Sequence, residues 1–248
     1  MVNVTICNAN SALQNLSQLE AQLSLREQHC LQKFSIAQRK QSFLLGRHAA
    51  RLALEPYFPK IAPFQIEIMN SSEPLSRGMP QVFLPGETEP TGHLSITHRD
   101  DWAAACFHPK QPIGIDRELV ETRDPSFQED HFTRSEKELF CLLMKENDCA
   151  QAISVLWSAK EAMSKALGKG LSLSTLQMES SLDSPSLLSF LAGDTVCLSY
   201  FGSVRLETKL LFFSLKTNFL KTKTGQTYVL TLAIHSGGKP CTKKLMKH

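Results

Sequence analysis

Residues 112–118 read Pro-Ile-Gly-Ile-Asp-Arg-Glu, a short apolar run that carries two acidic side chains at its end. On a β-strand, residues two apart point the same way, so Asp116 and Glu118 share one face and the two isoleucines share the other. Two carboxylates so placed repel each other unless a cation lies between them, and oxygen ligands suit a hard divalent ion. An edge strand with two solvated acids fits the same residues, so this stretch alone leaves both interpretations open.

A second stretch, residues 157–170, reads WSAKEAMSKALGKG and has the pattern of a helix that ends at glycine. Trp157, Glu161 and Lys165 are spaced four residues apart and therefore lie on one helical stripe. A third carboxylate held on a rigid helix would complete an oxygen-ligand site for Mg²⁺, and Lys160 and Lys165 could neutralise phosphates beside it. The simpler interpretation is an exposed Glu–Lys pair, which stabilises a helix by about 0.3–0.5 kcal/mol.

Upstream of both stretches, residues 17–55 are predicted to be helical, in more than one piece. Arg47 and Arg51 fall on one face, and Arg39 lies about 80° around the axis from Arg47 at about 100° per residue. Gly46 costs about 1 kcal/mol relative to alanine inside a helix, which indicates that something approaches closely there. A solvated basic face is the alternative interpretation of the arginines.

The remaining pattern predicts helices and short strands in an order that occurs twice. The capping-box pair Thr133 and Glu136 marks a helix start, and the polar stretch 121–131 is predicted to be a connection. Strands are expected at residues 63–70, 92–98, 102–108, 112–118, 195–201, 205–217 and 226–235, and further helices at 133–147 and 151–170. We therefore expect an α+β fold with two domains, 1–115 and 116–248, although no sequence identity links them.

Composition and charge restrict the class of protein. The 248 residues are 42% hydrophobic and 21% charged, with a net charge of +3, which excludes collagen-like and wholly disordered chains and does not point to nucleic acid. The seven cysteines form no zinc-ligand pattern, so we expect reduced thiols in the cytoplasm. No secretory signal and no run of 18 apolar residues occurs, so no membrane span is expected.

Taken together, the motifs resemble those of 4′-phosphopantetheinyl transferases of the surfactin and enterobactin type. That family carries G-[I/V]-D-x-E, here Gly114 to Glu118, and about forty residues later W/F-S-x-K-E-x-x-x-K, here Trp157 to Lys165. The strand end Ser95 to His98 and the segment Phe132 to Phe140 are also family-like, and the resemblance runs from about residue 34 to 173. Arg117 and Met79 depart from the pattern, standing where the family usually has a small or aliphatic residue and a lysine.

The resemblance implies two α+β halves related by a pseudo-twofold axis, with coenzyme A in the cleft between them. It implies that the N-terminal half holds the adenosine 3′-phosphate and the C-terminal half holds the metal and the pyrophosphate. The metal, Mg²⁺ or Mn²⁺, would be bound by Asp116, Glu118 and Glu161, and the pyrophosphate by Lys160 and Lys165. The 3′-phosphate side of coenzyme A would be held by Arg39, Arg47, Arg77, Thr97 and His98.

The function implied by the resemblance is transfer of the 4′-phosphopantetheine arm of coenzyme A to a serine of an apo acyl or peptidyl carrier protein, with release of 3′,5′-ADP. Glu161, Glu118 and Lys165 would be the catalytic side chains, and Glu161, Glu118 or a metal-bound water would take the serine proton. We expect a monomer that binds neither nucleic acid nor membrane. The alternatives are a Mg²⁺-dependent phosphohydrolase that uses the same acids and a basic binder of nucleic acid or acidic protein.

Overall fold

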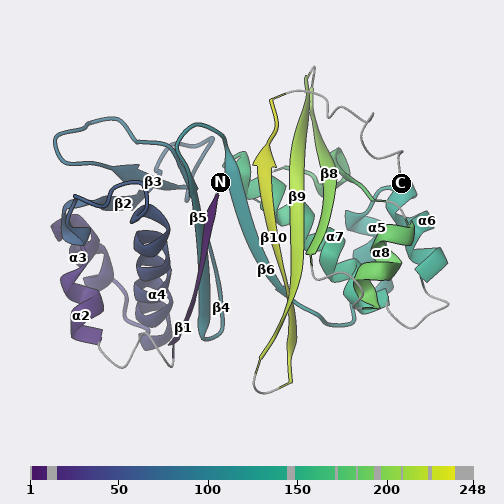
Figure 1. Ribbon diagram of the computed structural model, residues 1–248, viewed down its shortest axis with the longest axis horizontal. Helices are drawn as coiled ribbons and strands as arrows, with labels where there is room; N and C mark the ends of the chain where they lie inside the picture. The colour runs from purple at the N-terminus through teal and green to yellow at the C-terminus, as the bar shows by residue number, and fades with distance from the viewer. Residues whose placement is uncertain are drawn as a thin grey trace. The chain divides into compact units, whose positions relative to one another are not determined.

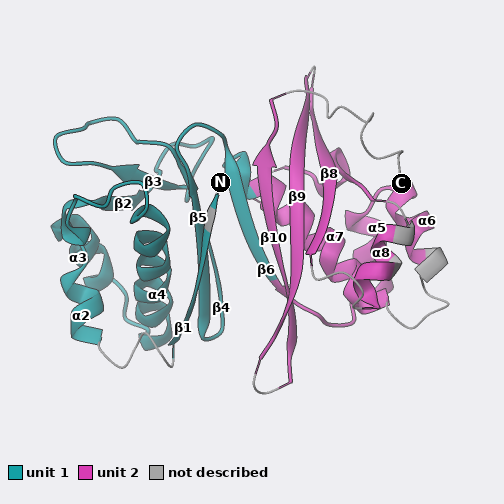
Figure 2. Cartoon of the chain, in the orientation of Figure 1, with its two compact units in different colours: residues 1–117, 165–169 teal, residues 118–164, 170–248 magenta. Residues whose placement is uncertain are grey.

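The computed structural model describes residues 2–9, 16–143, 149–170, 173–182, 184–192, 197–207, 209–222 and 225–237, and its elements form an α+β protein (Figure 1). The chain separates into two compact units (Figure 2). Unit 1 comprises residues 1–117 and 165–169, and unit 2 comprises residues 118–164 and 170–248. The α+β class expected from the sequence is confirmed.

Unit 1 is built on an antiparallel sheet of three strands in the order β1-β5-β4, with a two-stranded sheet of β2 and β3 beside it. The predicted helical region 17–55 is confirmed as three separate helices. The elements of unit 1 are β1 (Asn3–Asn8), α2 (Leu16–Ala21), α3 (Leu25–Gln32), α4 (Ala37–Leu54), a 3-10 turn (Pro63–Gln65), β2 (Glu67–Asn70), β3 (Pro80–Phe83), β4 (His93–Arg99), β5 (Trp102–His108) and the first part of β6 (Ile113–Leu119).

Helix α4 packs on the three-stranded sheet, as Figure 1 shows for the left-hand part of the chain. Its buried face carries Leu45, Ala49 and Ala53, which share one hydrophobic core with the small side chains of Ala103 and Ala105 on β5. Small residues on both surfaces let the helix and the sheet approach closely. At Gly46 an added Cβ would lie 3.3 Å from Cγ2 of Ile96 on β4, so the expected close approach at this glycine comes from the chain itself.

Unit 2 contains an antiparallel sheet in the order β6-β10-β9-β8-β7, and the chain passes from unit 1 to unit 2 within β6. Helix α7 packs on this sheet so closely that a Cβ on Gly202 of β8 would lie 2.6 Å from Sδ of Met163. The further elements are α5 (Pro125–His131), α6 (Arg134–Leu143), α7 (Cys149–Ala166), a 3-10 turn (Thr175–Gln177), β7 (Met178–Ser181), α8 (Ser184–Leu191), β8 (Cys197–Leu206), β9 (Lys209–Lys221) and β10 (Thr227–His235).

One predicted connection is wrong. Residues 121–131 contain helix α5, which begins with Asp124 as N-cap, its side chain accepting a hydrogen bond of 2.9 Å from the backbone N–H of Ser126, and with Pro125 in the first turn. Asp followed by Pro is a helix-start pattern, so the sequence did carry this helix. The predicted helix 133–147 is observed as α6 up to Leu143, and residues 144–148 lie outside the described residues.

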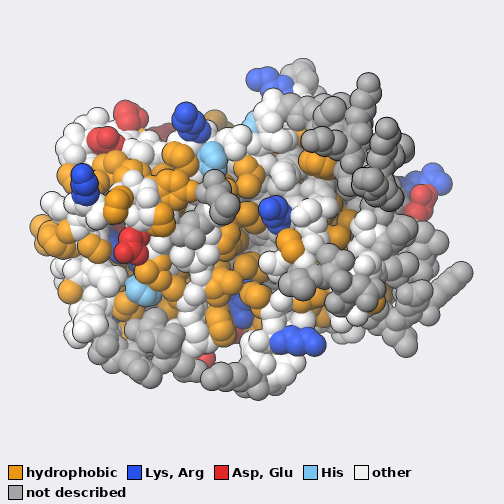
Figure 3. All heavy atoms as spheres, viewed as in Figure 1, with side chains coloured by type: hydrophobic (Ala, Val, Ile, Leu, Met, Phe, Trp, Pro, Cys, Tyr) orange, Lys and Arg blue, Asp and Glu red, His pale blue; other side chains and the backbone are white. Residues whose placement is uncertain are grey.

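Charged side chains are spread singly among apolar ones on the face drawn in Figure 3, where lysines and arginines do not gather into a stripe. That distribution agrees with the small net charge of +3. Across the part of the chain that the structure describes, no helix is both long enough and apolar enough to pass through a membrane.

Candidate active site

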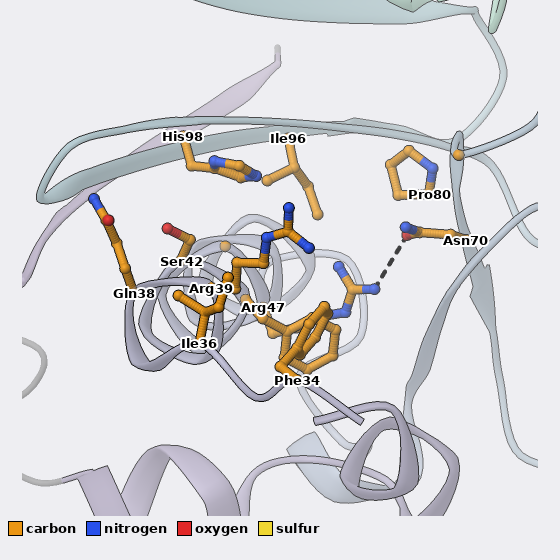
Figure 4. Close-up of a pocket in the computed structure, with 13 residues that line it drawn as sticks. Phe34, Ile36, Gln38, Arg39, Ser42, Arg47, Asn70, Pro80, Ile96 and His98 are labelled. Carbon is orange, nitrogen blue, oxygen red and sulfur yellow. Dashed lines mark hydrogen bonds between the residues drawn. The ribbon is translucent and has the colours of Figure 1, made fainter. Parts of the chain in front are cut away.

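A pocket of about 550 Å³ opens in unit 1 between helix α4 and strand β4 (Figure 4). Its lining mixes apolar side chains, among them Phe34, Ile36 and Ile96, with basic ones. The lining residues are Phe34, Ile36, Gln38, Arg39, Ser42, Phe43, Gly46, Arg47, Asn70, Gly78, Pro80, Ile96 and His98. A lining that combines apolar side chains with a few charged donors suits a ligand that carries both a ring and an anion.

Arg47 is the most firmly held basic group of this pocket. Its Nε lies 3.1 Å from Oε1 of Glu27, and its Nη2 donates to Oδ1 of Asn70 at 3.2 Å, the bond dashed in Figure 4. The guanidinium also lies over the ring of Phe43, 4.6 Å from its centre. Burial lowers the pKa of Arg47 to about 10, with the charge of Glu27 opposing that shift, so the side chain stays cationic at neutral pH.

Arg39 and His98 line the same pocket from α4 and from the end of β4, and both are exposed. Partial enclosure by protein is the main cause that lowers the pKa of His98 below its usual 6.5, and the positive charges of Lys165 and Arg47 lower it further. The imidazole is therefore neutral at pH 7. Three of the predicted 3′-phosphate residues thus meet in one cavity.

Two other arginines lie elsewhere. Arg77 is exposed and is not among the lining residues, although its neighbour Gly78 is. Arg51 is buried and does not line the pocket; its Nη2 lies 2.5 Å from Oε2 of Glu27, and it also donates to the backbone carbonyls of Pro63 and Ile66. Arg51 therefore has a structural part, and the interpretation of a solvated basic face is wrong for it.

Next to His98 along β4, Thr97 belongs to a second polar cluster of unit 1. The Nζ atom of Lys165 donates to Oδ1 of Asp116 at 2.6 Å and to Oγ1 of Thr97 at 3.4 Å. Asp116 and Thr97 are buried, whereas Lys165 is half-buried. The structure thus places one predicted metal ligand beside one predicted pyrophosphate residue, and both lie near the strand that supplies His98.

Met79, which stands where the family usually has a lysine, packs against the glycine turn that follows α7. Gly168 has a φ of +65°, and an added Cβ would lie 2.7 Å from Sδ of Met79. Met79 is thus a packing partner of this turn, and a side chain at Gly168 would meet both strain and steric conflict.

The other two predicted ligands belong to unit 2. Oε2 of Glu118 lies 3.2 Å from Nη2 of Arg123, which also pairs with Oε1 of Glu121 at 3.0 Å. Glu161 is half-buried on α7. The described residues contain no group of three or more His, Cys, Asp or Glu side chains that could hold a metal ion. Shared ligation by Asp116, Glu118 and Glu161 therefore stays a prediction.

The chemistry of these three side chains nevertheless fits a hard dication. All three offer carboxylate oxygens, the donors that Mg²⁺ prefers. Two of them already contact a cationic side chain, Lys165 at Asp116 and Arg123 at Glu118, so each stands where positive charge is stabilised. Arg123 was not singled out in the sequence because nothing in the motif marks it.

Lys160 differs from the other predicted phosphate residues. It is completely buried, and its Nζ lies 2.8 Å from Oε2 of Glu136 while donating to the carbonyls of Thr175 at 2.8 Å and Met178 at 2.6 Å. An ammonium group has three N–H donors, and these three acceptors use them all. We therefore leave Lys160 out of the coenzyme A site proposed below.

Glu136, the acid of the family-like segment Phe132 to Phe140, explains that arrangement. Its side chain accepts from the backbone N–H of Thr133 at 2.9 Å, completing the predicted capping box, and from the N–H of Ser180 at 3.2 Å. The capping box is confirmed, but the second use of this carboxylate, as the partner of Lys160, has no signal in the sequence.

Arg117, the other departure, is also accounted for. It is buried, its Nη1 donates to the carbonyl of Arg99 at 2.8 Å, and its guanidinium lies 5.6 Å from the centre of the Trp102 ring. It points away from the carboxylate face of β6, because neighbouring strand residues face opposite ways.

Comparison with known proteins supports the resemblance found in the sequence motifs. A family model described as the 4′-phosphopantetheinyl transferase superfamily matches residues 112–232. Over 80 residues the chain is 35% identical to 4′-phosphopantetheinyl transferase gsp of Aneurinibacillus migulanus, covering 32% of each chain. It is 25% identical to psf-1 of Bacillus pumilus over 65% of each chain, and 36% identical to Sfp of Bacillus subtilis over 34% of this chain and 37% of that one; both bear the same enzyme name.

The matches thus span between 32% and 65% of the length of these relatives. The matched region of the family model includes both motifs, Gly114 to Glu118 and Trp157 to Lys165. The resemblance expected from the sequence is confirmed: residues 112–232, just under half of this chain, match the 4′-phosphopantetheinyl transferase superfamily, and the three relatives are named as transferases of that kind.

Proposed function

We propose that this protein transfers the 4′-phosphopantetheine arm of coenzyme A to a serine of an apo acyl or peptidyl carrier protein and releases 3′,5′-ADP. The observation that carries the proposal is the pocket in which Arg39, Arg47 and His98 meet among apolar side chains. Together with the similarity to the superfamily, it supports binding of a 3′-phosphorylated adenosine in unit 1.

The proposed path of the ligand follows strand β4. The 3′-phosphate lies against Arg47, Arg39 and His98, and the pyrophosphate reaches Lys165, which already contacts Thr97. Arg77, which is exposed one residue from the pocket, could join the phosphate only by moving its side chain. The Nζ atom of Lys165 lies 2.6 Å from Oδ1 of Asp116, and it can contact a phosphate oxygen without leaving this cluster.

Asp116, Glu118 and Glu161 would hold a divalent cation, Mg²⁺ or Mn²⁺, which when bound neutralises charge on the diphosphate. This arrangement requires the two halves to bring their acids to one site, as the proposed pseudo-twofold pair of halves with a cleft between them would do. In that assignment residues 1–115 form the adenosine side and residues 116–248 the metal side.

In the reaction, the serine Oγ forms a bond to the β-phosphorus of coenzyme A. The bond from that phosphorus to the bridging oxygen breaks, and 3′,5′-ADP leaves with the electron pair. The serine proton passes to a carboxylate, for which Glu161 and Glu118 are the candidates. Positioning of the two substrates and neutralisation of the phosphates supply most of the acceleration in reactions of this type.

The partner is therefore an apo carrier protein, and we propose that the enzyme acts as a monomer in the cytoplasm. Among the described cysteines, Cys7, Cys30, Cys106 and Cys197 are free thiols, which suits a reducing compartment.

The test is to incubate the protein with coenzyme A, Mg²⁺ and an apo carrier protein and to weigh the carrier by mass spectrometry. A mass increase of one phosphopantetheine arm is expected, together with one equivalent of 3′,5′-ADP. Release of free phosphate with no change in the carrier would instead support the phosphohydrolase. A panel of fatty-acid, polyketide and peptide-synthetase carriers then identifies the preferred partner.

The acid residues are tested with Glu161→Gln, which keeps the shape of the side chain and removes its charge. We expect this variant to fold and to lose transfer, because Glu161 serves as a ligand or as the proton acceptor. Glu138→Gln is the matched control, since Glu138 is an exposed glutamate of α6 that pairs with Arg134 on the same helix. Wild-type turnover of Glu161→Gln at saturating Mg²⁺ would show that the assignment is wrong.

A further inference from the structure

We infer that Glu27, a buried glutamate outside every family motif, is the positioning residue that aims Arg47 into the pocket. The inference rests on the proposed function, because it assigns Glu27 to recognition of the 3′-phosphate of coenzyme A. Glu27 is completely shielded from solvent on α3, so it acts on the ligand only through Arg47.

Arg47 is held by two side chains that contact different nitrogens of its guanidinium. Glu27 contacts its Nε at 3.1 Å, while Asn70 contacts Nη2 at 3.2 Å from the neighbouring strand β2. A guanidinium has five N–H donors in a rigid plane, so fixing two nitrogens on one side determines where the remaining donors point. They point into the pocket, which Arg47 lines (Figure 4).

The charge balance of this cluster matters as well. A single carboxylate facing a single arginine would neutralise it and weaken its attraction for an anion. Here Glu27 is shared, because Arg51 takes both of its oxygens, with Nη2 2.5 Å from Oε2 and Nη1 3.2 Å from Oε1. Two arginines against one glutamate leave one net positive charge. Arg51 is turned toward backbone carbonyls, so the surplus charge faces the ligand at Arg47.

The carboxylate itself also cannot turn freely. The backbone N–H of Ser24 donates to Oε2 of Glu27 at 3.0 Å, and the backbone N–H of Glu27 donates to Oγ of Ser24 at 3.3 Å. This capping box fixes Glu27 to the start of α3. The same carboxylate therefore caps one helix, anchors Arg51 and orients Arg47, which organises the anion site before a ligand arrives.

The experiment measures binding of two nucleotides to the full chain by calorimetry. 3′,5′-ADP carries the 3′-phosphate and 5′-AMP lacks it, so the ratio of their dissociation constants isolates the contribution of that phosphate. We expect wild type to prefer 3′,5′-ADP and Glu27→Gln to reduce the preference about tenfold, because one well-aimed charge-assisted bond is lost. Binding of 5′-AMP should change little.

The matched control is Glu136→Gln. Glu136 is also a buried glutamate that completes a capping box and pairs with a buried cation, but it belongs to unit 2 and is not among the residues that line the pocket. Glu136→Gln should lower stability by a similar amount and leave the nucleotide ratio unchanged. Because both ligands require the folded protein, a general loss of folded chain cancels in the ratio.

Glu27→Asp provides a second variant, which keeps the charge and withdraws the carboxylate by one methylene group. A reduced preference in either Glu27 variant supports the inference. If wild type and Glu27 variants prefer 3′,5′-ADP equally while Arg47→Lys loses the preference, Arg47 binds the phosphate without help and the inference is wrong. If wild type itself shows no preference, the proposed phosphate pocket fails and the inference fails with it.

Discussion

Each unit contains a buried carboxylate paired with a basic side chain, but the two clusters do different things. In unit 1, Glu27 holds Arg47, and that guanidinium also lines a pocket. In unit 2, Glu136 holds Lys160, whose ammonium is enclosed by two further carbonyl acceptors. The two clusters use the same kind of ion pair, yet only one leaves its cation with donors to offer.

The difference lies in the number of donors. A lysine ammonium has three N–H groups and a guanidinium has five, so three protein acceptors use every donor of the first and leave donors on the second. The presence of a lysine or arginine in a family motif is therefore weak evidence that its side chain binds a phosphate. The count of its acceptors inside the protein decides whether it can bind a ligand or only hold helices and strands together.

The sharpest test of this comparison is Lys160→Met. Removing the cation leaves Glu136 buried with an uncompensated charge, so we expect the free energy of unfolding to fall by about 3–5 kcal/mol, measured by urea denaturation. The double variant Lys160→Met with Glu136→Gln should recover part of the loss, because the orphaned charge is gone.

Lys137→Met is the baseline for that experiment. Lys137 is on α6 and pairs with Glu129, which is largely exposed, so the change should cost less than about 1 kcal/mol. If Lys160→Met keeps wild-type stability and instead weakens coenzyme A binding, Lys160 is a phosphate residue after all and the comparison between the two clusters collapses.

The corresponding variant in unit 1 is Arg47→Met, which should affect ligand binding more than stability. Glu27 keeps Arg51 as a partner through both oxygens, so the loss of unfolding free energy should be smaller than for Lys160→Met. Affinity for 3′,5′-ADP should fall by about 10- to 100-fold, since charge-assisted bonds to a phosphate are lost. Calorimetry and urea denaturation on the same samples measure both quantities, and a purely structural Arg47 would move only the second.

Much of the secondary structure was predictable because local patterns of apolar and polar residues mark many of the helices and strands. The apolar run in residues 102–108 corresponds to β5, and the apolar spacing of Leu45 and Ala49 corresponds to the buried face of α4. Strand β1 was not predicted, and α5 was mistaken for a connection even though Asp124 and Pro125 mark its start. A short strand such as β1 owes its existence to pairing with β5, and that pairing cannot be inferred from six residues.

The site was predictable only where a motif names its residues. His98, Arg39 and Arg47 were singled out by the resemblance and line one pocket. Glu27 and Asn70, which hold Arg47, lie 20 and 23 residues from it along the chain, and their identities fit ordinary helix and strand positions. Contacts of this kind arise from tertiary packing, so sequence spacing carries no trace of them.

The smallest expected effect concerns His98, the imidazole among the basic residues that line the pocket. Enclosure by protein and the charges of Lys165 and Arg47 hold the pKa of His98 below 6.5 in the free protein, so it is neutral at pH 8 and gains a proton only as the pH falls below that value. A bound 3′-phosphate favours the protonated form of His98, so the preference for 3′,5′-ADP over 5′-AMP should rise on acidification.

The measurement has to separate His98 from the phosphate itself. The phosphate takes up a proton over the same pH range, with a second pKa near about 6, and that effect is common to wild type and His98→Gln. The wild-type preference divided by the His98→Gln preference should therefore be about two- to fivefold larger at pH 5.5 than at pH 8, as expected for an exposed charge pair. If that quotient stays flat with pH, His98 does not meet the phosphate, and Arg47 with Arg39 carries recognition alone.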